Sequence, residues 1–271
     1  MSNTLKLFIA MWVLSTLALA QHQSQPAAVA RAGGPDATAE CSATFSSGIG
    51  QNNTTFCVTV NGNIAEFSVN GLEMIEVGQV GEGYGICDGS SNTSYFDYAY
   101  EDSGNWRSPS FSQKGDVVTV TRETSDGVWQ LRQTITNVPA TGTGPGSAKI
   151  SMALKNLTGV SRVVSVLRFA DVDADNNSSN NDFDFTSQTA YGLAPGGLFS
   201  GRGLGITNNT FSSSISQTAF TQFTFNGPDP CSPGEDVASQ PFQGDGSVVM
   251  FWEYNATHGA TTTLESTYKP I

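Results

Sequence analysis

Positive charge is the first thing that this sequence lacks. Its 271 residues contain 12 Lys and Arg against 24 Asp and Glu, so the formal net charge is −12. An acidic surface repels the phosphate backbone of nucleic acids, whereas it attracts divalent cations. We therefore expect no nucleic-acid partner.

Histidine and the common catalytic motifs are also scarce. The chain has two His residues: His22 lies in a predicted linker, and His258, in "YNATHGA", is interpreted as a turn residue. The sequence has no G-x-S-x-G elbow for a serine hydrolase and no His/Cys cluster for zinc or copper. A glycosidase remains open, because it needs only two carboxylates about 5 to 10 Å apart. The candidates are Glu82, Asp97, Glu101 and Glu253.

A long apolar run occurs only at the N-terminus. One basic residue, Lys6, precedes it, and it ends in small residues of the A-x-A type at Ala20. This pattern is typical of a cleaved secretory signal, and the run is too short for a span of about 20 apolar residues. We predict a signal peptide over 1–20, a flexible Gln-, Ala-, Gly- and Pro-rich linker over 21–40, and export to an extracellular or periplasmic compartment. No membrane span is expected in the mature chain.

Four cysteines lie in the exported part, and none of their spacings is C-x-x-C. An even count in an oxidising compartment predicts two disulfides rather than a metal site. Cys41 and Cys57 bracket a short Gly- and Asn-rich turn, so we pair them. Cys87 and Cys231 then form a long-range bond between two Gly/Pro-rich segments.

A sustained helical period is missing throughout 41–271. Short segments rich in Val, Ile, Thr, Phe and Tyr recur between turn signals, which predicts one large antiparallel β-sandwich domain over 41–271. Hairpins are expected at Asn61-Gly62, at Asp126-Gly127 and near 156–159. "SVVMFWEY", over 247–254, is apolar on both faces and is expected to be a central strand.

The stretch "VGQVGEGYGICDG" is rich in glycine. A phosphate-binding loop would need a Lys and a following helix, and the sequence here has neither. We expect an irregular loop that is held by Cys87.

Acids and amides are concentrated in "RFADVDADNNSSNNDFDF", over 168–185, directly after a predicted strand. Alternate residues of a twelve-residue loop can direct oxygen atoms at one hard cation. The predicted metal ligands are Asp171, Asp173, Asp175, Asn177 and Asp182, with Ser179 between them in the spacing.

In its D-x-D-x-D core this stretch resembles the calcium loop of EF-hand proteins. It departs from that pattern because the closing position is Asp182 rather than Glu, no helices flank it, and one copy is present. An EF-hand switch is therefore excluded. Two interpretations stay open: a structural calcium site, and a solvated turn in which these residues only make local hydrogen bonds.

Aromatic and acidic residues gather between Tyr84 and Trp106. An exposed ring flanked by carboxylates can bind a sugar, because the ring gives apolar area and the acids accept hydroxyl hydrogen bonds. The alternation of Phe96, Tyr98 and Tyr100 also fits the core face of a strand. Trp106 lies beyond this strand and is expected at the surface. The predicted ligand-binding residues are Tyr95, Trp106, Asp97 and Glu101.

Together these features predict a secreted β-sandwich binding or surface-interaction module. The expected partner is a glycan or a cell-surface polymer, and the expected cofactor is a structural calcium ion. Two alternatives remain: a carbohydrate-active enzyme with a carboxylate pair near the aromatic cluster, and a purely structural envelope protein.

Overall fold

The chain is described by a computed structural model that covers residues 40–78, 80–142, 144–196, 202–223, 227–234 and 237–271. In these residues the regular elements are antiparallel strands and one short 3-10 turn, η1 (Gly50–Asn52). The prediction of an all-β protein is confirmed. The predicted signal peptide, and the predicted linker up to residue 39, lie outside the described residues.

Within these described ranges the strands form three sheets. The first sheet contains, in spatial order, β1 (Cys41–Ser47), β2 (Thr54–Thr59), β3 (Ile64–Val69) and β4 (Leu72–Glu73). The second sheet contains β16 (Phe242–Gly244), β12 (Asn181–Phe185), β13 (Thr189–Leu193), β14 (Gly203–Asn208), β18 (Thr261–Pro270), β10 (Ser147–Asn156), β9 (Trp129–Val138), β8 (Val117–Glu123) and β7 (Ser110–Lys114). The third sheet contains β15 (Ser216–Gln222), β17 (Ser247–Ala256), β11 (Arg162–Asp171), β5 (Glu82–Asp88) and β6 (Thr93–Asp97).

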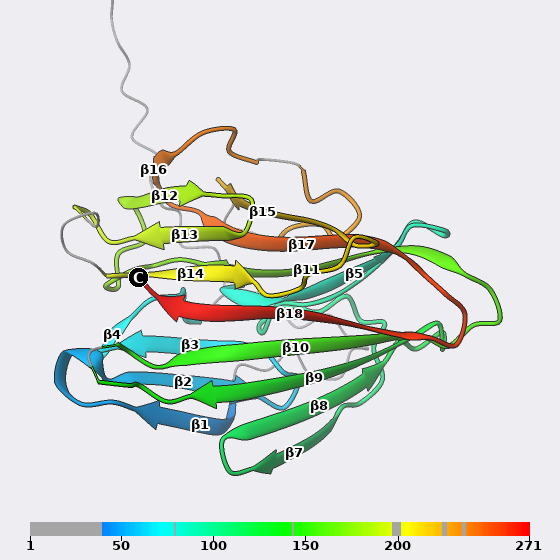
Figure 1. Cartoon of the computed structure of the whole chain (residues 1–271), viewed down its shortest axis with the longest axis horizontal. Coiled ribbons are helices and arrows are strands. Elements are labelled where there is room, and N and C mark those ends of the chain that lie inside the picture. Colours follow the sequence, from blue (N-terminus) through cyan, green and yellow to red (C-terminus); the bar gives the residue numbers. More distant parts are fainter. Residues whose placement is uncertain (1–39, 79, 143, 197–201, 224–226, 235–236) are drawn as a thin grey trace, which may run out of the picture.

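The three sheets share one apolar core. In Figure 1 the nine-stranded sheet runs from β7 at the bottom to β16 at the top, and the other two sheets pack against it. Phe56 and Phe67 of the first sheet, Leu131 and Ile150 of the second, and Ile86 of the third belong to the same buried cluster. The predicted antiparallel sandwich is confirmed.

Buried and exposed side chains alternate along the strands, so one face of each such strand packs against the core. On β9, Trp129, Leu131 and Ile135 are buried, whereas Gln130 is half-buried and Arg132 is exposed, because successive side chains point to opposite faces. β17 lies between β15 and β11, and its first half is buried on both faces, as predicted for a central strand.

Two of the three predicted hairpins are confirmed. β2 and β3 pair across the turn at Asn61-Gly62, and β8 and β9 pair across Asp126-Gly127. Gly62 and Gly127 have φ values of +91° and +73°, which these tight turns require and which glycine adopts without strain.

The third predicted hairpin, near 156–159, is wrong. β10 is already paired with β9 and β18, and β11 is paired with β17 and β5, so the two strands lie in different sheets. The Asn156 amide donates to the carbonyls of Val160 and Ala256, at 2.8 and 3.0 Å. These bonds hold the turn as a connection between the sheets rather than as a hairpin.

The Gly-rich stretch is also different from the prediction. Instead of an irregular loop, residues 82–88 form the fully buried strand β5, which is paired on both sides. A Cβ atom on Gly83 would lie 2.1 Å from the carbonyl oxygen of Asp97, and one on Gly85 would lie 2.4 Å from Pro230 Cγ. The glycines are needed because neighbouring groups lie directly on the strand.

Both predicted disulfides, Cys41–Cys57 and Cys87–Cys231, are confirmed. The first joins neighbouring strands β1 and β2, and the second joins β5 to the segment that follows β15. Disulfides persist in oxidising compartments, so they indicate an extracellular or periplasmic protein. Among the described residues we find no helix with the length and hydropathy required to span a bilayer.

Candidate functional site

Three of the four predicted ligand-binding residues lie in the core. Tyr95, Asp97 and Trp106 are at most 3% exposed, so none of them offers a surface to a ligand. The prediction of an exposed Trp106 is wrong: its Nε1 donates to the carbonyl of Phe96 at 3.1 Å, and its ring packs edge-on against Tyr84 and Tyr95. These partners satisfy the indole and explain its burial.

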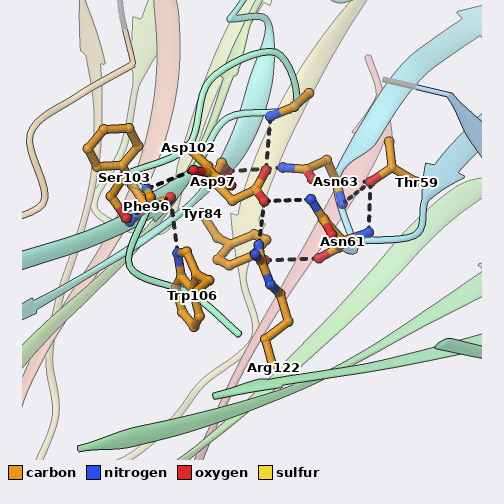
Figure 2. Close-up of polar contacts among 12 residues, drawn as sticks. Thr59, Asn61, Asn63, Tyr84, Phe96, Asp97, Asp102, Ser103, Trp106 and Arg122 are labelled. Atoms are coloured by element: carbon orange, nitrogen blue, oxygen red, sulfur yellow. Dashed lines mark hydrogen bonds and ion pairs between the residues drawn. The ribbon is translucent and has the colours of Figure 1, made fainter. Parts of the chain in front are cut away.

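Asp97 is the centre of a buried polar network (Figure 2). Its carboxylate forms an ion pair with Arg122 of β8 and accepts a 2.9 Å hydrogen bond from the Asn61 amide. Its carbonyl accepts a bond from Asn63 at 3.0 Å. Burial raises the pKa of Asp97 to about 6, although the attraction of Arg122 acts in the opposite direction. Because the network joins β6 of the third sheet to β8 of the second and to the β2–β3 turn of the first, we interpret it as structural rather than as a ligand site.

A second buried ion pair lies nearby. Arg168 of β11 pairs with Glu82 of β5, and the same Glu82 carboxylate accepts hydrogen bonds from Tyr268 Oη at 2.8 Å and from the Ile64 backbone at 2.6 Å. Both charged side chains are fully buried. Glu82 and Asp97, two of the acids considered for catalysis, are therefore committed to structural pairs.

The outer face of β6 carries a different surface. Here a groove with a volume of about 310 Å³ opens between the strand and the loop that carries the second disulfide. Its lining residues are Phe96, Tyr98, Glu101, Gly227, Pro228 and Asp229. The Phe96 ring is half-buried and stacks on Tyr98 with 4.7 Å between the centroids, and Tyr98 meets Phe169 edge-on. Glu101 is the one predicted ligand-binding residue that lines this groove.

The opposite wall of the groove is fixed by several contacts. Tyr98 Oη donates to the Pro228 carbonyl, and Asp229 accepts bonds from Ser94 Oγ at 2.8 Å and from the Cys231 backbone at 2.9 Å. The Cys87–Cys231 disulfide then ties this wall to β5. The groove therefore has one partly exposed aromatic ring, Phe96, which buried rings support, and a wall that presents a carboxylate.

We expect Gly85→Ala to loosen this wall. The added methyl group would overlap Pro230 at 2.4 Å, so the loop has to move, and overpacking of this kind costs about 1 to 3 kcal/mol. Urea unfolding measures the loss. Gly159→Ala is the matched control, because a Cβ there has no atom within 4 Å. Equal losses in both variants would contradict the assignment.

The acidic stretch after β11 does bring carboxylates together. Oxygen atoms of Asp171, Asp173 and Asp245 all lie within 4.8 Å of one another. Asp245 comes from the turn between β16 and β17, far from the predicted loop in sequence. We call these three residues the acidic cluster.

The other predicted ligands have different partners. Asp175 forms an ion pair with Arg202 at 2.8 Å, and Asp182, on β12, accepts a bond from Gln243 at 3.2 Å. The Asn177 side-chain oxygen accepts bonds from the backbones of Ser179 and Asn180. Of the predicted ligands, Asp171 and Asp173 thus converge with Asp245, whereas Asp175, Asn177 and Asp182 have the partners given above. Metal binding by these residues stays a prediction.

Two carboxyl groups of the acidic cluster, those of Asp171 and Asp173, have raised pKa values. Burial raises the pKa of Asp171 well above its ordinary value, and the nearby carboxylates of Asp173, Asp245 and Glu76 raise it further. For Asp173 burial, followed by Glu76 and Asp245, raises the pKa to about 7. The folded chain therefore gathers acids that repel one another in a partly dry environment.

Two residues of these sites were not predicted from the sequence: Asp245 of the acidic cluster and Asp229 of the groove. Asp245 stands alone between two glycines in "GDG", and this pattern suggests only a turn. Asp229, in "GPDPC", is two residues from Cys231, so the predicted Cys87–Cys231 bond was a signal that it lies near β5.

No protein-family model and no curated protein sequence matches the chain. Solved structures do resemble its fold. A bacterial glucoamylase complexed with acarbose has a TM-score of 0.56 and 11% identity, over 85% of this chain and 32% of the glucoamylase. The Slr1438 protein from Synechocystis sp. PCC 6803 has a TM-score of 0.46 and 9% identity, over 84% and 95% of the two chains. The heparan sulfate lyase HepC from Pedobacter heparinus has a TM-score of 0.44 and 12% identity, over 84% and 34%.

The chain therefore spans about a third of the length of the glucoamylase that it resembles. At this identity the similarity concerns the fold alone. The chain is a disulfide-bonded, all-β sandwich, and its fold resembles about a third of that glucoamylase.

Proposed function

We propose that this protein is an exported carbohydrate-binding module whose ligand lies in the groove on the outer face of β6. The observation that carries the proposal is the half-buried Phe96 ring, which buried Tyr98 supports from behind, with the carboxylates of Glu101 and Asp229 on the same groove. A sugar presents an apolar C–H face and a rim of hydroxyl groups. An aromatic ring fits the first, and carboxylates accept hydrogen bonds from the second.

The negative charge of the protein limits the class of glycan that can bind in the groove. With a formal net charge of −12 and two acids on the groove, the protein repels sulfated or uronic-acid polymers. A neutral polysaccharide or oligosaccharide is the ligand class that we propose. The fold similarity to a glucoamylase is compatible with this class, and the confirmed disulfides fit a protein that meets its ligand outside the cytoplasm.

A second groove is a poorer candidate. It has a volume of about 540 Å³ and includes Met74, Arg202, Pro270 and Ile271. None of its described lining residues is aromatic, so it lacks a surface on which a sugar ring can stack.

The test is a glycan array with neutral and anionic glycans, followed by calorimetric titration of the best binder. We expect neutral glycans to bind, and we expect Phe96→Ala to weaken binding about tenfold or more, because a lost stacking contact of about 1.4 kcal/mol has that effect. Glu101→Gln should weaken binding less, because an amide still offers one acceptor oxygen.

Phe211→Ala is the matched control, because Phe211 is 80% exposed and does not line the groove. Binding that is unchanged in Phe96→Ala, or equally weakened in Phe211→Ala, would contradict the proposed site. Release of reducing sugar from a bound glycan would instead identify a carbohydrate-active enzyme that uses the two groove carboxylates.

A further inference from the structure

The acidic cluster of Asp171, Asp173 and Asp245 lies at the end of β11, and none of its three residues lines the groove of the proposed carbohydrate site. Backbone hydrogen bonds hold its three segments together. The Asp171 carbonyl accepts a bond from Glu76 at 3.1 Å, Val172 donates to Gly246 at 3.1 Å, and Asp173 donates to Met74 at 3.2 Å. The convergence of the carboxylates is therefore built into the fold.

Negative charge in the cluster has no cationic partner at Asp171 or Asp173. Within the described residues neither side chain forms an ion pair with Lys or Arg, and Arg202 is engaged by Asp175 instead. A buried carboxylate without a cation beside it is costly, because desolvation removes the water that stabilises its charge. A fold that only required solubility would not bury acids in this way.

Asp171 gives the more specific observation. The residue is 1% exposed and its carboxylate contributes to the converging oxygen atoms. The carboxyl group shares a hydrogen bond with Glu76, but within the part of the chain that the structure describes its Oδ1 has no hydrogen-bond partner. Buried polar atoms are paired in most proteins, so this lone acceptor indicates an absent donor or cation. The surrounding groups offer acceptors, which makes a cation the better fit.

We infer that Asp171, Asp173 and Asp245 bind a calcium ion that joins the end of β11 to the turn between β16 and β17. The three ligands are hard oxygen donors, and the cluster contains no His or Cys, a donor set that suits calcium rather than zinc or copper. Calcium takes six to eight oxygens, so the Glu76 carboxylate, backbone carbonyls and water can supply the rest. This ligand set replaces the twelve-residue loop that the sequence suggested.

The ion would have a structural effect that the groove does not share. Residues 74–76 follow the first sheet, Asp171 ends a strand of the third sheet, and Asp245 follows β16 of the nine-stranded sheet. One cation would therefore link segments from all three sheets. Its removal should lower the stability of the whole sandwich and leave glycan specificity unchanged.

The experiment is a thermal melt of the full chain, first stripped with a chelator and then titrated with calcium chloride or magnesium chloride. At a calcium concentration about 100 times its Kd, we expect the Tm to rise by roughly 5 to 10 °C. Magnesium should give a smaller shift because it requires stricter octahedral geometry. Calorimetric titration should show one calcium ion for each chain.

Single Asp→Asn variants distinguish calcium binding at this site from a general effect of lowering the negative charge of the protein. Asp173→Asn and Asp245→Asn should abolish the calcium shift, and without calcium their Tm should equal or exceed that of the wild type, because one repelling charge is gone. Asp175→Asn is the matched control: it removes an acid from the same loop, yet Asp175 is paired with Arg202, so the calcium shift should remain.

Three results would overturn the inference. A wild-type Tm that calcium leaves unchanged would exclude the site. A calcium shift that survives both Asp173→Asn and Asp245→Asn would locate the ion elsewhere. Loss of the shift in Asp175→Asn together with its survival in Asp245→Asn would restore the twelve-residue loop instead.

Discussion

Replacing Arg122 with Met should lower the free energy of unfolding at pH 7 by about 3 to 5 kcal/mol, as measured by urea denaturation. Arg122 is 1% exposed and forms an ion pair with fully buried Asp97. Its guanidinium also donates to Tyr84 Oη at 3.1 Å and lies 4.9 Å from the centre of the Trp106 ring. Without the arginine, the buried Asp97 carboxylate loses its cation, so its charge is either left unpaired or neutralised by a proton, and both cost stability at pH 7.

The loss should depend on pH in a defined direction. The pKa of Asp97 is raised from 3.8 in the unfolded chain to about 6 in the fold, so the stability that its proton provides is complete below pH 3.8 and is lost as the pH rises through 6. Removing Arg122 removes an attraction that lowers this pKa, and the pKa therefore rises further. The gap between variant and wild type should be largest near pH 8 and should shrink towards pH 5.

Two further variants test whether the effect belongs to the buried pair. Arg122→Met combined with Asp97→Asn should recover most of the loss, because no charge is then left unpaired. Arg107→Met is the exposed counterpart: Arg107 and Glu123 are 53% and 33% exposed, so the cost should stay below about 1 kcal/mol. A pH-independent loss, or a double variant that is no better than Arg122→Met, would show that lost packing rather than charge dominates.

The same network explains why the candidate ligand site was only partly predictable. Side chains alternate along a strand, so Tyr95 and Asp97 share one face of β6 and Phe96 lies on the other. This alternation does not show which face meets the core. Both faces do so here, because a second buried cluster, which includes Phe169 and Phe220, packs against Phe96 on the outer face. Asp97 points inward since Arg122 and Asn61 are there to pair with it. Those partners are distant in sequence and leave no local signal.

Features that depend on neighbouring residues or on covalent chemistry were predicted well. The turns at Asn61-Gly62 and Asp126-Gly127 require positive φ angles, and Asn-Gly and Asp-Gly pairs are typical of such turns. Four cysteines permit only a few disulfide pairings, so both bonds were predictable. The acidic cluster is an intermediate case. Asp171 and Asp173 are two residues apart at the end of one strand, whereas Asp245 joins them only because β17 pairs with β11.

Removing the Cys87–Cys231 disulfide by substituting both residues with Ala should lower the free energy of unfolding by about 4 to 5 kcal/mol. In the chain-entropy account the loss grows with the length of the closed loop, and these cysteines are 144 residues apart. The Cys41–Cys57 bond spans only 16 residues, so the matched double substitution there should cost about 3 kcal/mol. Urea unfolding of the two variants measures the difference.

The two disulfides should also differ in their effect on the groove. The segment that carries Pro228 and Asp229 is tied to β5 by Cys231, whereas the Cys41–Cys57 bond lies at the edge of the first sheet. At a temperature where both variants remain folded, glycan affinity should therefore fall without Cys87–Cys231 and stay at the wild-type value without Cys41–Cys57. If both variants bind equally well, other contacts, such as the hydrogen bonds that Tyr98 and Ser94 donate to Pro228 and Asp229, hold the wall without the disulfide. If the short-loop variant is the less stable of the two, native-state contacts rather than loop entropy determine what each disulfide contributes.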